Sequence, residues 1–386
     1  MISTRYEIRI PFYFLILLSV SFVLSIFAMQ LFGAALVILW LFEKNSEKKK
    51  AIDSFIIAVL IYGLIRIISI IFSEYPDESI SALYREALFF LSIFPIGFYL
   101  KSFDDQKKKI IIYSFIAGAV INSLIGIIQF NLGLVSRAES LSSGYMVFSI
   151  YLLSALGIVS SLFLLNKEDK KINWLLVSGN AIILSGIVAS LGRANLAIAL
   201  LILFSSLLLK LIDIKSTTLI IILAAIVSFI SFQNNSGEVT QRIESPASLS
   251  DRDIIFKGAV ELAWEHPVLG FGPRTFKEIF PFREEFADKG ISGWHNHIFQ
   301  VYFESGLIGL AAYLYIFVII FKTGLRAVKT LNDEKKKIVK GILLSVSALF
   351  LASFFSSVID TPVLSIVFVF IVSIKNSEIY PKQSGV

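Results

Sequence analysis

The sequence lacks cysteine altogether and has few charged residues for its length. Its 386 residues include no cysteine, three histidines and 17% charged side chains. Without cysteine the chain has no disulfide bond, no thiol nucleophile and no thiolate ligand for a metal. The segments expected outside the membrane also contain no group of carboxylates at ligand spacing. We therefore expect neither a metal site nor a cofactor.

Apolar residues are abundant, at 56% of the chain, and the mean hydropathy is +0.79. This composition is far too apolar for a soluble chain of this length. The predicted fold class is therefore all-α, a polytopic integral membrane protein. The formal net charge of +6 does not indicate nucleic-acid binding, because basic residues in membrane proteins mostly mark loop orientation. The expected partner is the lipid bilayer, with no nucleic acid.

Apolar runs long enough to cross about 30 Å of hydrocarbon predict about 12 transmembrane helices. The first run, 10–42, is too long for one helix and has basic residues at both ends, so we expect a tight hairpin of two crossings. The other expected spans are single crossings: 54–72, 84–100, 110–130, 146–165, 174–191, 194–210, 217–232, 298–321, 341–359 and 362–374.

The positive-inside rule assigns sides to the connections between these spans, because cytoplasmic connections carry an excess of basic residues. Most lysines fall in every second connection, and we expect these connections and both termini on the cytoplasmic side. The connections are 43–53, 101–109, 166–173, 210–216 and 322–340. Most arginines lie instead at or beyond the outer boundary. Lysine therefore indicates the topology, and the outer arginines need another explanation.

This topology divides the chain into four parts. We expect transmembrane helices 1–9 in 1–232, a large external loop in 233–297, helices 10–12 in 298–374 and a cytoplasmic tail in 375–386. All other external loops are short. The large loop therefore carries most of the soluble chemistry available to this protein.

Within the large loop, the sequence predicts two helical stretches separated by a turn. Ser250 is a plausible N-cap for an amphipathic helix over 251–265, which we expect to lie against the membrane. The turn contains Gly270, Gly272 and Pro273. A second short helical stretch is expected around 274–287.

Three segments then resemble the O-antigen ligase and polymerase superfamily. They are "ASLGRANLAIAL", "DRDIIFKGAVELAWEHPVLGFG" and "HNHIFQVYFESGLIGL". The last fits the family pattern of His-Asn, an apolar run and Glu-x-Gly-x-x-Gly through His295, Asn296, Glu304, Gly306 and Gly309. The first departs from the commoner Ser-Arg-Gly form of the family. The resemblance covers about residues 185 to 325.

The resemblance implies transfer of a glycan from an undecaprenyl-pyrophosphate carrier to an acceptor hydroxyl at the outer leaflet. It implies a metal-independent glycosyltransferase of the bacterial inner membrane, with its active site facing the periplasm or cell exterior. The expected partners are the carrier-linked glycan donor and a lipid A core or glycan acceptor. We favour O-antigen ligation to lipid A core, within lipopolysaccharide biosynthesis.

The chemistry of such a reaction needs a general base and permanent positive charges. His295, just before the span 298–321, is the expected catalytic base for the acceptor hydroxyl. Arg193, in a tight turn between spans, and Arg252, in the first turn of its helix, are expected to bind pyrophosphate. Snorkelling to lipid phosphate is the ordinary alternative for Arg193.

Further residues are expected to support the site. Arg66 lies within an apolar run, where charges are rare and usually functional or paired, and we expect it to pair with Glu304 as a structural bridge. His297 is expected to point away from His295. Gly306 and Gly309 predict close helix packing. Asn296 and Arg274 complete the supporting set.

Other functions remain open on the sequence alone. A 12-helix transporter or a lipid-linked glycan flippase would have similar topology, but those folds tend to show repeated halves with broken helices. A non-catalytic scaffold would not need arginines enriched on one face. Within the enzyme class, a polymerase or a protein-glycosylating member differs from a ligase only in its acceptor.

Overall fold

The computed structural model describes residues 9–141, 143–163, 169–235, 237, 240, 252–286 and 293–380. Every regular element in these ranges is a helix. The helices are α2 (Arg9–Ser21), α3 (Ile26–Leu41), α4 (Asn45–Ala51), α5 (Ser54–Ile71), α6 (Pro76–Ser102), α7 (Asp105–Asn131), α8 (Tyr145–Leu162), α9 (Lys170–Ala189), α10 (Arg193–Leu208), α11 (Ile214–Asn234), α13 (Arg252–Leu262), α14 (Phe276–Ile279), the 3-10 turn η1 (Arg283–Phe286), α15 (His297–Thr330), α16 (Asp333–Ala352) and α17 (Pro362–Ile379).

The all-α, polytopic membrane class is confirmed. Within the described ranges, eight helices are long and apolar enough to cross a membrane, and α2, α3 and α10 are shorter apolar helices. Each expected span overlaps one helix, including the two helices of the 10–42 hairpin. The bounds of 341–359 are wrong, because α16 ends at Ala352, and α16 is not among the helices apolar enough to cross. Ser25 separates α2 from α3, and its side chain caps α3 by accepting from Ala28 N. The number of crossings, about 12, stays a prediction.

Three connections that the sequence predicts as loops are largely helical. The connection 43–53 contains α4, 101–109 is occupied by the end of α6 and the start of α7, and 322–340 by the end of α15 and the start of α16. All three are rich in lysine, which is a strong helix former. Their composition therefore agrees with the observed helices.

The core of the bundle is built around α8 and α17, which are buried on nearly all sides. A helix that is hydrophobic all round belongs in the interior. Helix α8 packs antiparallel to α16, with Ser345 Oγ donating to Ser154 O at 2.5 Å. The small residues Gly157 and Gly341 also face one another there, so the two backbones approach closely.

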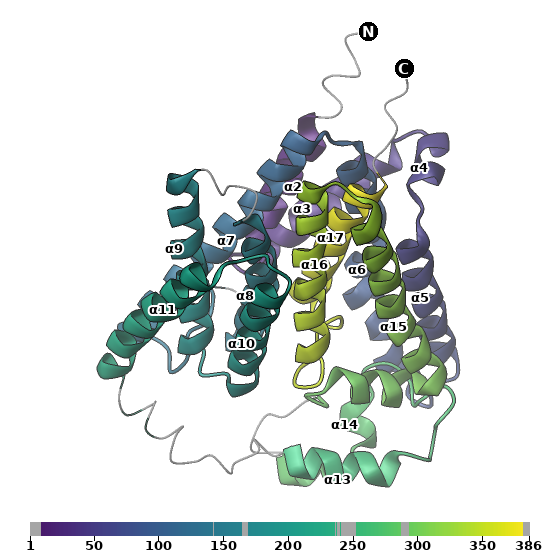
Figure 1. Ribbon diagram of the computed structural model, residues 1–386. Coiled ribbons are helices and arrows are strands. Elements are labelled where there is room, and N and C mark those ends of the chain that lie inside the picture. The colour runs from purple at the N-terminus through teal and green to yellow at the C-terminus, as the bar shows by residue number, and fades with distance from the viewer. Residues whose placement is uncertain are drawn as a thin grey trace.

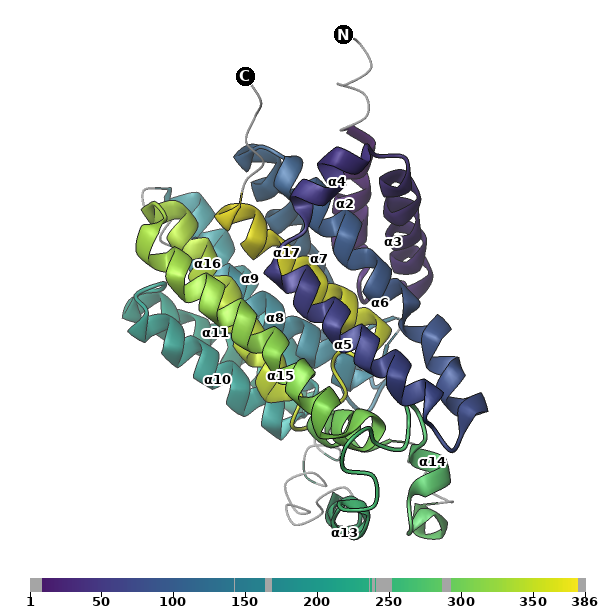
Figure 2. The same ribbon diagram turned by 90° about the vertical axis from the view of Figure 1, so that its right-hand side faces the viewer.

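The two ends of the bundle differ. Helix α2 begins and α17 ends at one end of the bundle, near α4, whereas α13 and α14 lie at the opposite end (Figure 1). Helix α13 lies across that end, roughly perpendicular to the spans, and is seen end-on in Figure 2. The described helices of the predicted large loop thus form a layer over one end of the bundle.

A separate aromatic cluster holds this layer together. Helix α13 buries Ile255, Ala259 and Leu262 against a group that includes Phe280 and Trp294. This supports the predicted amphipathic helix, although Ser250, its expected N-cap, lies outside the described residues. The layer therefore has its own apolar core.

The second predicted helix of the loop, 274–287, is wrong as a single element. Only α14 and η1 form there, and the backbone between them is extended at Phe280, with φ −68° and ψ 119°. Pro281 follows directly. A residue before proline is disfavoured in the helical region, so proline divides the stretch in two.

Candidate functional site

His295 lies at the start of α15, in a backbone conformation that its neighbours enforce. Its φ is 47°, in the left-handed region that non-glycine residues seldom occupy. Trp294 before it is buried and stacked on Phe303, with ring centroids 4.1 Å apart. Asn296 after it is the N-cap of α15 and accepts from Phe299 N at 3.1 Å. The imidazole itself remains exposed.

Asn296 thus has a structural role, because its side chain caps the helix. The backbone N–H of His297 is also held, donating to Ser353 O at 2.7 Å. The side chain of His297 is buried and packs edge-on to Tyr313 at 5.1 Å. His297 therefore lies in the bundle interior, as expected, while His295 faces outward.

Arg252 lies close to His295. Its guanidinium donates to Phe355 O at 2.9 Å and lies over the ring of Phe355 at 5.7 Å. Partial burial lowers the pKa of His295, and the positive charge of Arg252 lowers it further. Both effects favour the neutral imidazole, which is the form that can accept a proton.

The α16–α17 connection, 353–361, thus contacts both Arg252 and the segment that follows His295. Ser353 O fixes the backbone at His297, two residues after His295, and Phe355 O fixes Arg252. Two carbonyl oxygens of one short connection therefore orient both the histidine segment and the start of α13.

Arg193 begins α10 at the same end of the bundle. Asn195 Nδ2, two residues on, donates to Ser149 Oγ at 2.6 Å in the first turns of α8. Because α8 and α16 are antiparallel, the start of α8 lies beside the end of α16. The preceding turn is tight, with Leu191 at φ 53°, and Arg193 is exposed. The fold therefore places Arg193, Arg252 and His295 around one end of α16.

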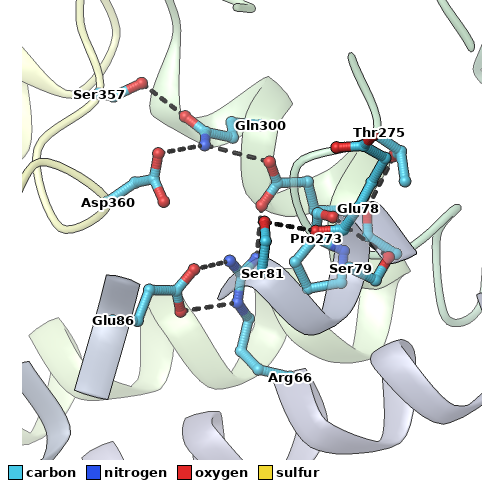
Figure 3. Close-up of polar contacts among 12 residues, drawn as sticks. Arg66, Glu78, Ser79, Ser81, Glu86, Pro273, Thr275, Gln300, Ser357 and Asp360 are labelled. Carbon is cyan, nitrogen blue, oxygen red and sulfur yellow. Dashed lines mark hydrogen bonds and ion pairs between the residues drawn. The ribbon is translucent and has the colours of Figure 1, made fainter. Parts of the chain in front are cut away.

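Arg66 forms the centre of a buried ionic network (Figure 3). Its Nη1 lies 2.6 Å from Glu304 Oε2, and its Nη2 and Nε contact the carboxylate of Glu86. Arg66 is 4% exposed and Glu304 2% exposed. The predicted Arg66–Glu304 bridge is confirmed, and the sequence analysis missed Glu86. That glutamate was detectable, because it is an acidic residue inside the apolar run 84–100.

Gln300 extends this network to the α16–α17 connection. Its Nε2 donates to Glu304 Oε1 at 3.1 Å and to Asp360 Oδ2 at 2.8 Å, and its Oε1 accepts from Ser357 (Figure 3). Sequence reasoning missed Gln300, Ser357 and Asp360. Gln300 lies one helical turn before Glu304, so the spacing places both on one face. Nothing local in the sequence links them to 357–360.

Gly306 breaks α15 directly after this network. Its φ is 65° and its ψ −167°, a conformation that is essentially restricted to glycine. The turn that follows α13 packs against α15 at this break. Leu307 N donates to Pro267 O at 2.8 Å, and Phe271 N donates to Phe303 O at 2.7 Å. The prediction of close helix packing at Gly306 is therefore wrong, because a loop backbone, not a helix, makes the close approach.

Arg274 follows that turn and has φ 64°. The turn is tied to the α5–α6 connection, since Ser73 Oγ donates to Phe271 O at 2.7 Å and Ser79 Oγ to Pro273 O at 3.2 Å. Arg274 is half-buried, and its backbone N–H hydrogen-bonds to the carboxylate of Glu304. Arg274 thus lies beside the ionic network of Arg66.

The arrangement combines an exposed neutral imidazole with guanidinium groups at one end of an apolar bundle. Such a site can take a proton from a hydroxyl and neutralise an anionic group. The described residues contain no group of three or more histidine or acidic side chains able to hold a metal ion. The arginines are the permanent positive charges there.

Comparison with known proteins found one family match. Residues 178–314 match the model of the O-antigen ligase family, a range that includes Arg193, Arg252, His295 and Glu304. No curated protein matches the chain. The chain thus combines helices long enough to span a membrane, as in a multi-pass membrane protein, with a segment, 178–314, that is similar to the O-antigen ligase family.

Proposed function

We propose that this protein transfers a glycan from an undecaprenyl-pyrophosphate carrier to an acceptor hydroxyl at the outer leaflet of the inner membrane. The favoured reaction is O-antigen ligation to lipid A core. One observation supports this most strongly: two carbonyl oxygens of the α16–α17 connection hold Arg252 Nη2 and the backbone N–H of His297, two residues after His295. A neutral base and a permanent cation are thus neighbours at one end of the bundle.

In the proposed reaction, His295 takes the proton of the acceptor hydroxyl. The acceptor oxygen forms a bond to the anomeric carbon of the donor sugar as the bond from that carbon to the pyrophosphate oxygen breaks. The electron pair of the broken bond leaves with undecaprenyl pyrophosphate. A positioned base contributes about 10²–10⁴-fold to such a step.

Arg252 and Arg193 are proposed to hold the pyrophosphate. Guanidinium suits this role better than ammonium, since its planar fork matches two phosphate oxygens at once. Arg252 also lies in the first turn of α13, where unpaired backbone N–H groups favour an anion. The pyrophosphate is tethered to a membrane lipid, so the proposed site must lie at the membrane surface.

The proposed orientation places α13, α14 and His295 on the periplasmic side and both termini in the cytoplasm. The start of α2 and the end of α17 lie at the end of the bundle opposite α13 (Figure 1), which agrees with this topology. The lysine-rich connections support the same assignment through the positive-inside rule.

A deletion strain tests the reaction. If the protein is a ligase, carrier-linked long polymer accumulates and the surface glycan is lost, and the wild-type chain restores it. Single repeats on the surface of the deletion strain would indicate a polymerase instead. An unchanged surface glycan and an unchanged pool of carrier-linked glycan would contradict the transferase proposal.

A further inference from the structure

Gln300 connects the buried ionic network to the connection that holds the proposed catalytic groups. Its side chain is 7% exposed and makes three hydrogen bonds, to Glu304, Asp360 and Ser357. A primary amide has two N–H donors and a carbonyl acceptor. Its Nε2 donates to both carboxylates and its Oε1 accepts from the hydroxyl, so the amide orientation is fixed by its partners.

The partners of Gln300 lie on elements that are distant in sequence. Glu304 is on α15 itself and is paired with Arg66 of α5. Ser357 and Asp360 belong to the α16–α17 connection. Gln300 thus attaches this connection to a part of the bundle that is held by a buried ion pair.

The same connection supplies the two carbonyl oxygens that orient the proposed site. Ser353 O accepts from His297 N at 2.7 Å, and Phe355 O accepts from Arg252 Nη2 at 2.9 Å. Ser357 lies only two residues after Phe355. A shift of the connection at Ser357 would therefore move the acceptor that holds Arg252.

We propose that Gln300 is a positioning residue for glycan transfer: it fixes the α16–α17 connection, and through Ser353 O and Phe355 O it sets His295 and Arg252 relative to one another. This inference rests on the function proposed above. Gln300 touches neither substrate nor reacting atoms in this account. Its action is geometric, and a displacement of about 1 Å at a reacting group can cost about 10²-fold in rate.

The first test measures position without measuring activity. Because the chain has no cysteine, spin labels can be placed at two engineered cysteines alone, Glu261→Cys on exposed α13 and Asp333→Cys at the far end of α16. Gln300→Leu should broaden the distance distribution between the labels. Gln30→Leu, at an exposed site on α3, removes the same amide and should leave the distribution unchanged. An unchanged distribution in Gln300→Leu would overturn the proposal.

The second test measures coupling in the transfer reaction. Gln300→Leu should lower kcat/KM by about 10²-fold. Because the guanidinium of Arg252 is then already misplaced, Arg252→Ala should lower kcat/KM by a smaller factor in the Gln300→Leu background than in the wild-type background. Additive losses with Arg252→Ala would overturn the positioning role.

A conservative pair completes the design. Ser357→Ala removes the hydroxyl that donates to Gln300, and Ser357→Thr keeps it, so the threonine variant should recover most of the activity lost in the alanine variant. Ser347→Ala, whose hydroxyl bonds only Leu343 O in its own helix, is the matched control. Equal activity of the two Ser357 variants would contradict the proposal. Absence of transfer by the wild-type chain would count against the proposed function alone, because the spin-label distances would still report on positioning.

Discussion

Arg66 Nη1 and Glu304 Oε2 lie 2.6 Å apart in the interior of the bundle, joining α5 to α15 across 238 positions of sequence. The pair is almost completely shielded from solvent, and Glu86 completes the coordination of the guanidinium. A buried charge that loses its partner is strongly destabilising. Removal of either partner should therefore destabilise the bundle.

Arg66→Ala should lower the free energy of unfolding by about 3–5 kcal/mol, because it leaves the carboxylates of Glu86 and Glu304 buried without their cation. Thermal or chemical unfolding in detergent measures the loss. Lys50→Ala is the matched control, since Lys50 pairs with Glu47 in an ion pair whose lysine is 70% exposed, and it should cost at most about 1 kcal/mol. Equal losses in the two variants would contradict the structural role of Arg66.

Gly306→Ala should prevent the turn after α13 from docking into α15. An added Cβ would lie 2.1 Å from Val268 O, and φ at this position is 65°, so the variant combines a clash with about 1–3 kcal/mol of backbone strain. Gly293→Ala is the control, because a Cβ there meets nothing within 4 Å. Unfolding in detergent compares the two variants, and a Gly306→Ala protein as stable as Gly293→Ala would show that the break in α15 is dispensable.

His295→Ala should abolish transfer yet leave carrier binding nearly intact, because a general base acts mainly in the transition state. The rate of the wild-type protein should rise with pH as the imidazole loses its proton. Burial and Arg252 lower the pKa of His295 below its usual value of about 6.5, so the midpoint of this rise should lie below about pH 6.5. The profile of kcat/KM between about pH 5 and about pH 8 measures it.

Arg252→Ala should move the rising limb of that profile to higher pH, since it removes a positive charge that disfavours the imidazolium. Arg193→Ala is the comparison: it should lower the rate without moving the limb. A limb that stays in place in Arg252→Ala would contradict the electrostatic coupling. Substantial turnover by His295→Ala with both substrates saturating would remove His295 from the base role.

Lysine at position 252 or 193 should restore only part of the donor affinity lost with alanine. A point charge can attract the pyrophosphate but cannot reproduce two parallel hydrogen bonds to it. Binding of the carrier-linked donor to purified Arg252→Lys and Arg252→Ala proteins measures the difference, after their thermal stabilities have been matched. Full affinity in both variants would show that Arg252 does not bind the donor.

Transfer should survive chelation by EDTA, because the guanidinium groups already supply permanent positive charge to the leaving group. Activity of the purified protein before and after chelation checks this. Loss of activity on chelation, with recovery on addition of Mg²⁺ or Mn²⁺, would mean that a divalent ion neutralises the pyrophosphate.

The sequence by itself determined the all-helical membrane class and the positions of the apolar helices. Hydropathy is a local property, and a segment in lipid must satisfy its backbone hydrogen bonds within itself, so each apolar run had only one available structure. The Arg66–Glu304 pair was also predictable, because an isolated charge in an apolar span requires a partner at similar depth. Glu86 could have been found by the same reasoning.

Only the tertiary structure decided which polar residues meet around the α16–α17 connection. Gln300, Ser357 and Asp360 are ordinary polar residues in their own segments, and their contacts depend on how distant helices pack. The role of Gly306 also depended on the fold, since a glycine in an apolar run is compatible both with close helix packing and with a break in the helix. Local patterns specify elements through backbone hydrogen bonding, but the partners of a buried side chain are set by the assembly of the whole bundle.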